Sequence, residues 1–160
     1  MIPTDEYIKY IGQMPVLCVD LVIRNSHGEY FLVRRANEPK KDHWWPVGGR
    51  VLKGETLDQA ARRKIQEETS LRIRDLQPVG YFETVSDTHP FGQEGKYHAV
   101  SVVFAAEVDG HGSIKLDDQS TEWKFSKELP PDFQIRSFEP MQQSAIRSDR
   151  SSSQNIKEDE

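Results

Sequence analysis

The chain has 160 residues, a formal net charge of −5 at pH 7 and one cysteine, Cys18. This length suits a single domain with a sizeable core, and the acidic balance excludes the basic footprint that is typical of nucleic-acid binding. With one cysteine the chain cannot form an internal disulfide. It shows no signal-peptide pattern and no apolar run long enough to cross a bilayer, which favours a cytoplasmic protein without a membrane segment.

Helix and strand patterns alternate along the first half of the chain. A short helix is predicted at 5–11, where apolar residues share one face, and a buried strand at 15–24. The turn at 25–28 leads into an alternating strand at 29–35, so the two strands are predicted to form a hairpin. A polar loop, a Gly-Gly turn and a central helix are predicted next, at 37–42, 44–51 and 56–69.

Strands dominate the second half. They are predicted at 79–85, 98–108 and 122–125, with a polar loop at 86–96 and a turn at 109–112. Ser137 is the predicted N-cap of a last helix that runs to about Arg147. The polar segment 148–160 is predicted to be a disordered tail outside a domain of residues 1–147.

The central helix carries charged residues on its apolar face. Thr56 and Gln59 form a capping-box pattern that predicts the start of the helix. At 100° per residue, Lys64 and Glu68 share a face with the helix's apolar residues, Leu57, Ala60, Ala61 and Ile65. An acid that faces the packed side needs a cation or a strong donor, and a metal ion is the natural partner.

The segment 48–71 resembles the signature of the Nudix family, G-x5-E-x7-R-E-U-x-E-E-x-G-U, in which U is apolar. The residues in register are Gly49, Glu55, Arg63, Ile65, Glu67, Glu68 and Leu71. Lys64 and Ser70 depart from the signature, at positions of Glu and Gly. An ordinary amphipathic helix is the alternative, but this many positions in register favour the family. The resemblance implies an α/β fold, the Nudix-type α/β/α sandwich with a mixed β-sheet.

Outside that segment the chain resembles the GDP-mannose mannosyl hydrolases of the same family, in its residues 15–39, 43–51 and 117–123. This resemblance implies a nucleotide-sugar substrate, Mg²⁺ or Mn²⁺ as cofactor, water attack at the sugar carbon, and a homodimer formed through the N-terminal segment. In that subfamily, too, the acid after the signature arginine is missing. Lys64 is expected to pair with Glu68 one turn later and to weaken any second metal site.

The resemblance also assigns roles to individual residues. The candidate metal ligands are Glu68, Glu67, the carbonyl of Gly48, and Gln119. Because guanidinium groups bind phosphate in a bidentate manner, the candidate substrate ligands are Arg35 and Arg50, together with Asp20. Solvated side chains are the alternative for Gln119, for both arginines and for Asp20.

The catalytic candidates are Arg63 and His89. Glu55 is expected to hold the signature loop through Arg63. The mannosyl hydrolases have a His after the Gln ligand, where this chain has Ser120, and a neutral hydroxyl is a poor base near pH 7. His89, in the loop 86–96, is the substitute base that we predict, because an ordinary histidine pKa of about 6.5 suits the role. A solvated loop histidine is the alternative.

Three functions therefore stay open. The first is hydrolysis of a sugar nucleotide at the sugar carbon, and the second is cleavage of a nucleoside diphosphate derivative at phosphorus. The third is a weakly active module that binds nucleotide, for which Lys64 and Ser120 both argue.

Overall fold

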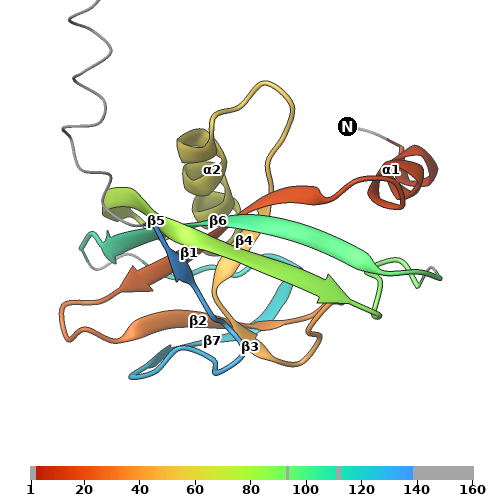
Figure 1. Ribbon diagram of the computed structural model, residues 1–160. Helices are drawn as coiled ribbons and strands as arrows, with labels where there is room; N and C mark the ends of the chain where they lie inside the picture. Colours follow the sequence, from red (N-terminus) through yellow and green to blue (C-terminus); the bar gives the residue numbers. More distant parts are fainter. Residues whose placement is uncertain (1–2, 93, 111–112, 139–160) are drawn as a thin grey trace, which may run out of the picture.

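A mixed sheet of eight strands and two helices make up the structure, a computed structural model that describes residues 3–92, 94–110 and 113–138 (Figure 1). In chain order the elements are α1 (Thr4–Ile11), β1 (Val16–Arg24), β2 (Tyr30–Arg35), β3 (Trp44–Trp45), β4 (Val47–Arg50), α2 (Leu57–Thr69), β5 (Ile73–Ser86), β6 (Tyr97–Val108), β7 (Ser120–Ser126) and β8 (Arg136–Ser137). The mixed α/β architecture that the sequence predicts is confirmed.

The strand β1 is the centre of the sheet. It pairs in parallel with β6 along its whole length and antiparallel with β4. Residues 18–23 are all buried, which is typical of a strand that is covered on both faces. The predicted hairpin with β2 closes at Arg24 and Tyr30, but β2 then leaves β1 and pairs with β7 and β3.

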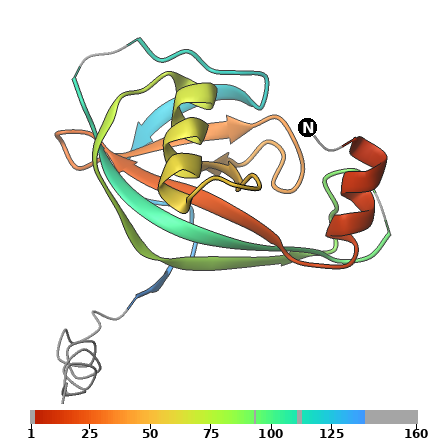
Figure 2. The same ribbon diagram turned by 90° about the horizontal axis from the view of Figure 1, so that it is seen from above.

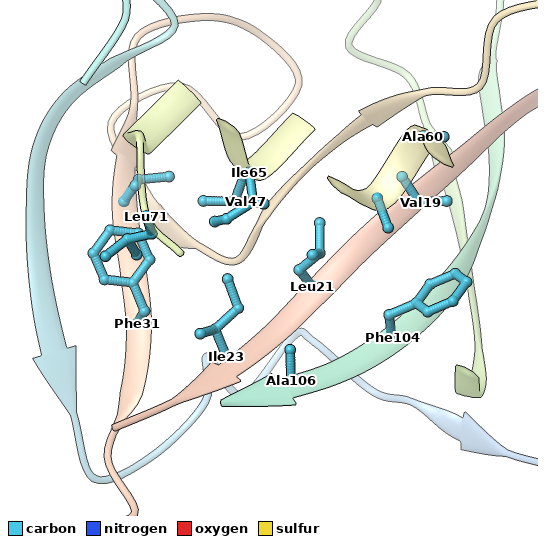
Figure 3. Close-up of a cluster of buried hydrophobic side chains, with 12 residues drawn as sticks. Val19, Leu21, Ile23, Phe31, Val47, Ala60, Ile65, Leu71, Phe104 and Ala106 are labelled. Carbon is cyan, nitrogen blue, oxygen red and sulfur yellow. The ribbon is translucent and has the colours of Figure 1, made fainter. Parts of the chain in front are cut away.

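The two faces of β1 contribute to different parts of the core. Val19, Leu21 and Ile23 point toward α2 and pack in the cluster that Figure 3 shows, together with Ile65 and Phe104. The alternating residues point the other way. Val22 packs there with Trp45, Val103 and Phe133, and Val16 and Cys18 pack near α1 with Ile11 and Tyr97.

Three predicted elements differ from the structure. Gly48 and Gly49 lie inside β4 and not in a turn, because both pair with β1. The strand β5 begins at Ile73 instead of 79, and register shifts on both sides of Pro78 interrupt the alternation that would reveal it. Ser137 lies in β8 and is not a helix N-cap. The rest of the predicted last helix and the tail at 148–160 lie outside the described residues.

Neither described helix has the length and apolar character needed to cross a membrane.

Candidate active site

Local interactions fix both ends of α2. The Thr56 side chain accepts a hydrogen bond from the Gln59 N–H (3.2 Å), and the Gln59 side chain accepts one from the Thr56 N–H (2.8 Å). The capping box predicted from the sequence is therefore confirmed. At the other end, Ser70 adopts the left-handed conformation with φ of 56°, which a glycine would adopt with less strain.

Glu55 and Arg63 hold the loop before α2. Arg63 Nε and a terminal nitrogen donate to the two oxygens of Glu55 at 2.9 and 2.6 Å, and that same nitrogen donates to the Arg50 carbonyl at 2.9 Å. The hydrogen bond from Arg63 lowers the pKa of Glu55 to about 2; burial opposes this change, and the hydrogen bond from the Leu52 N–H adds to it. The loop-holding role of Glu55 is confirmed. Arg63 thus positions the loop, and its catalytic role stays a prediction.

Lys64 and Glu68 form an ion pair inside the protein. Their side chains are only 8% and 5% exposed, and the Lys64 ammonium contacts Glu68 Oε1 and lies 4.0 Å from Glu67. The predicted i, i+4 pair is therefore confirmed. Burial raises the pKa of Glu68 to about 7; Lys64 opposes that rise, Asp117 adds to it and Arg35 opposes it.

Asp117 is a neighbour of Glu68 that the sequence reasoning missed. Its N–H donates to the Glu68 carbonyl (3.2 Å), and its carboxylate accepts hydrogen bonds from the backbone and side-chain nitrogens of Gln119 at 2.9 and 2.8 Å. The Gln119 carbonyl in turn accepts from the Ala36 N–H (2.9 Å), next to Arg35. Gln119 thus lies between α2 and the end of β2. In the sequence, the two acids directly before Gln119, Asp117 and Asp118, were the pattern that could have indicated this neighbour.

Asp20 lies on the opposite face of β1 from α2. It is 8% exposed and pairs across the sheet with Gly48, where a side chain would collide with its carboxylate. Burial raises its pKa to about 6, although a hydrogen bond with Ser101 and the charge of Arg35 oppose that rise. The alternative of a solvated Asp20 is therefore wrong. The charge of Arg35 lowers the pKa of both Asp20 and Glu68, against the effect of burial, and the Arg35 Nε donates to the Pro39 carbonyl at 2.9 Å.

Arg50 and His89 lie toward α1. The Arg50 guanidinium stacks on the Tyr7 ring, 4.0 Å from its centroid. His89 is 7% exposed, packs edge-on against Tyr97, and its Nδ1 accepts from the Phe91 N–H (3.3 Å). The loop that carries His89 lies beside α1 and away from α2 (Figure 2). The described contacts do not bring His89 to Glu68, and its aromatic neighbours explain why it is not a solvated loop histidine.

The oxygen donors near Glu68 are of the kind that a divalent cation prefers, but few of them are carboxylates. Among the described residues, Glu68 Oε1 is the one buried side-chain oxygen or nitrogen without a hydrogen bond of regular geometry, although the Lys64 ammonium forms an ion pair with it. In the same residues no group of three or more His, Cys, Asp or Glu side chains is placed to hold a metal ion. Glu68, Glu67, the Gly48 carbonyl and Gln119 stay the predicted ligands, and Asp117 joins them as a neighbour.

Comparison with known proteins gives one family. The family model described as the NUDIX domain matches residues 14–142. The low-salt glycan biosynthesis protein Agl8 of Haloferax volcanii is 32% identical over 123 residues, which cover 77% of this chain and 78% of that protein. The ADP-ribose pyrophosphatase of Methanocaldococcus jannaschii is 33% identical over 111 residues, which cover 69% of this chain and 61% of that protein.

Solved structures share the fold at low sequence identity. The NUDIX domain of Shewanella oneidensis NrtR, complexed with ADP ribose, has a TM-score of 0.61 and 19% identity, with 94% of this chain and 99% of that chain covered. The MutT NUDIX hydrolase of Burkholderia pseudomallei has a TM-score of 0.63 and 20% identity, with 76% and 92% covered.

Proposed function

The chain belongs to the Nudix family of hydrolases, and we propose that it hydrolyses a nucleoside diphosphate-linked sugar, such as GDP-mannose, by water attack at the anomeric carbon. The products would be the free sugar and the nucleoside diphosphate. The similarity to a glycan biosynthesis protein, at 32% identity, supports a sugar nucleotide as the class of substrate.

The observation that carries this proposal is the buried Lys64 ammonium beside Glu68, in place of the acid of the family signature. Attack at phosphorus usually recruits several metal ions to neutralise the phosphoryl oxygens, and these ions need a cluster of carboxylates. Attack at the sugar carbon needs charge stabilisation on the departing diphosphate and a base for the water. A site in which one carboxylate is paired to a lysine therefore suits attack at the sugar carbon better than attack at phosphorus.

The side chains around Arg35 would bind the substrate. Arg35 and Arg50 offer guanidinium groups for the diphosphate, a geometry that suits phosphate oxygens. Glu68, Glu67, the Gly48 carbonyl and Gln119 would hold Mg²⁺ or Mn²⁺. When bound, the ion would stabilise the negative charge of the leaving diphosphate.

We assign the base to Asp20 in place of His89. Asp20 pairs across the sheet with Gly48, whose carbonyl is a predicted metal ligand, and burial raises the pKa of Asp20 to about 6, a value suited to proton transfer near neutral pH. His89 instead packs among aromatic residues beside α1.

Cleavage at phosphorus is the second candidate function. The similarity to an ADP-ribose pyrophosphatase favours it, because ADP-ribose also joins a sugar to a nucleoside diphosphate. Both reactions would start from the same class of substrate and differ in the bond that breaks.

Hydrolysis in ¹⁸O-labelled water tests the proposal. A panel of sugar nucleotides that includes GDP-mannose and ADP-ribose is incubated with Mg²⁺ or Mn²⁺, and the products are analysed by mass spectrometry. Label in the free sugar is expected, whereas label in a phosphate would establish the second function. No turnover on the whole panel would favour a nucleotide-binding module.

We further propose a cytoplasmic homodimer that forms through the N-terminal segment. Tyr10, Met14 and Leu17 are about half exposed in this segment, which supports an apolar contact. Light scattering of the purified protein measures the oligomeric state, and a monomer at micromolar concentration would contradict the dimer.

A further inference from the structure

We propose that Tyr7 of α1 is a positioning residue for the candidate site, because its ring holds the Arg50 guanidinium in the orientation that binds the diphosphate of the substrate. The inference rests on the proposed function in taking Arg50 as a diphosphate ligand. It gives a role to α1, which lies outside the signature segment and apart from α2 (Figure 2).

The strand β4 fixes the backbone of Arg50. Arg50 pairs with Cys18 of β1, and its carbonyl accepts a hydrogen bond from Arg63 at 2.9 Å. Gly48 pairs in the same way with Asp20, two positions further along β1. Residues opposite each other in a sheet share one face, and so do residues two apart on a strand. The Arg50 side chain therefore leaves the sheet on the face that carries Asp20, the proposed base.

The side chain of Arg50 is exposed, and among residues 3–92, 94–110 and 113–138 no carboxylate forms an ion pair with it. Its Cζ atom lies 4.0 Å from the centroid of the Tyr7 ring. A guanidinium that stacks on a ring uses its flat face, whereas its N–H donors lie in its plane. These donors thus stay available for bidentate bonds to phosphate oxygens.

Tyr7 is itself held in place on the side of α1. Its ring packs edge-on against Phe91, with the ring centroids 5.8 Å apart. It also packs against a buried cluster that consists of Ile11, Val16, Cys18, Tyr97 and Ala99. A ring anchored in this way restricts the rotamers of Arg50 before the substrate arrives. Less side-chain entropy is then lost on binding, which strengthens the binding of the diphosphate.

Diphosphate binding tests the inference separately from turnover. GDP, ADP and inorganic pyrophosphate are titrated with Mg²⁺ into the parent, Tyr7→Leu, Tyr7→Phe, Arg50→Ala and the double variant of Tyr7→Leu with Arg50→Ala, by calorimetry. Tyr7→Leu is expected to weaken binding about 3- to 10-fold through the lost stacking. Tyr7→Phe keeps the ring and should bind as the parent does. In the Arg50→Ala background, Tyr7→Leu should change nothing further.

Tyr30→Leu is the matched control, because Tyr30 also has an arginine over its ring. Arg24 lies 5.3 Å from the Tyr30 centroid, at the opposite end of β1 from Val16 and Cys18. This variant removes the same kind of contact away from the site and should bind all three ligands as the parent does. Circular dichroism melts check that each variant folds, and Tyr7→Met replaces Tyr7→Leu if the latter does not.

Parental affinity in Tyr7→Leu would overturn the inference, and so would an equal loss in Tyr7→Phe and Tyr7→Leu. A loss that persists in the Arg50→Ala background would also overturn it, because Tyr7 would then act through the fold and not through Arg50. A parent that binds none of the three ligands would contradict both this inference and the proposed function. The expected binding pattern without turnover of any sugar nucleotide would contradict the proposed function alone and leave this inference standing.

Discussion

Asp20 and Glu68 are the two buried carboxyl groups that distinguish this site at the scale of single residues. They lie on opposite faces of β1, and burial raises the pKa of both, to about 6 and about 7. Asp20 has a hydroxyl partner, Ser101, whereas Glu68 has the Lys64 ammonium. Two carboxyl groups in different surroundings are typical of sites where each has its own role. We propose Asp20 as the base and Glu68 as the ligand of the cation.

Glu68→Gln is expected to abolish most turnover and to weaken Mn²⁺ binding while the protein still folds. The neutral amide removes the charge that binds the ion but can still accept a hydrogen bond from Lys64, so we expect a loss of about 1–3 kcal/mol of stability. Urea unfolding and Mn²⁺ titration measure the two effects. Unchanged turnover at saturating Mg²⁺ would remove Glu68 from the ligand set.

Asp20→Asn is expected to flatten the pH dependence of stability between about pH 4 and 6. The pKa of Asp20 is raised from 3.8 to about 6 in the folded state, so the folded protein binds this proton more tightly than the unfolded chain. That contribution is complete below about pH 4 and is lost as the pH rises through 6, to a total of about 3 kcal/mol. Urea unfolding of parent and variant at pH 4.5 and 7.5 checks this difference. Equal pH dependence in both proteins would mean that Asp20 is not desolvated.

Arg35→Ala is expected to raise KM for a sugar nucleotide far more than it lowers stability. A charge-assisted hydrogen bond to a phosphate contributes roughly 1.5–3 kcal/mol, or about a 10- to 100-fold change in KM. Arg34→Ala is the control, because Arg34 is the neighbouring arginine and pairs with Glu122 on the outside of the sheet. A large fall in melting temperature with an unchanged KM would make Arg35 a structural residue.

The helix α2 is the element that organises the site. Its capping box fixes the first turn, the Glu55–Arg63 pair fixes the loop before it, and its last turn carries Glu68. The C-cap is the weak point, since Ser70 has a φ of 56° and lacks the freedom of a glycine.

Ser70→Gly is expected to stabilise the protein by about 0.5–1 kcal/mol, because glycine adopts the left-handed conformation without a Cβ penalty. Thr56→Ala at the opposite end is the comparison and should cost about 1 kcal/mol through the lost cap. Urea midpoints of both variants measure these changes. A lower stability of Ser70→Gly would show that a contact of the serine side chain stabilises the protein by more than the left-handed conformation costs.

At the scale of the whole molecule, β1 joins the parts of the core. It contributes Val19, Leu21 and Ile23 to the cluster under α2, and Val22 and Val16 to the clusters on its other face. Packing on both faces of one strand ties these clusters together, so we expect the described residues to unfold as a unit.

Ile23→Ala is expected to cost 2–5 kcal/mol, because Ile23 is fully buried and the truncation leaves a cavity in the cluster. Far-UV circular dichroism and tryptophan fluorescence should still report one coincident transition. Trp45 and Trp123 lie on different parts of the sheet, and fluorescence therefore samples both. Two separated transitions would show that the clusters unfold independently.

Features made by residues close together in the chain were predictable without the structure. The capping-box partners are three positions apart and Lys64 and Glu68 four, so side-chain type and helical geometry were enough to predict them. The Glu55–Arg63 pair is eight positions apart, and the family resemblance predicted it. The turn at 25–28 and the apolar strand β1 were predictable for the same reason.

Tertiary structure alone decided the features that depend on distant pairing. Gly48 and Gly49 became part of a strand because β1 lies beside them, nearly thirty residues earlier in the chain. Asp117 reached Glu68 through a backbone hydrogen bond across 49 positions, and His89 became buried beside Tyr97 and Phe91. Local sequence patterns do not show which distant strand will pair with a given segment. That pairing depends on the apolar surface that is buried when the whole sheet forms.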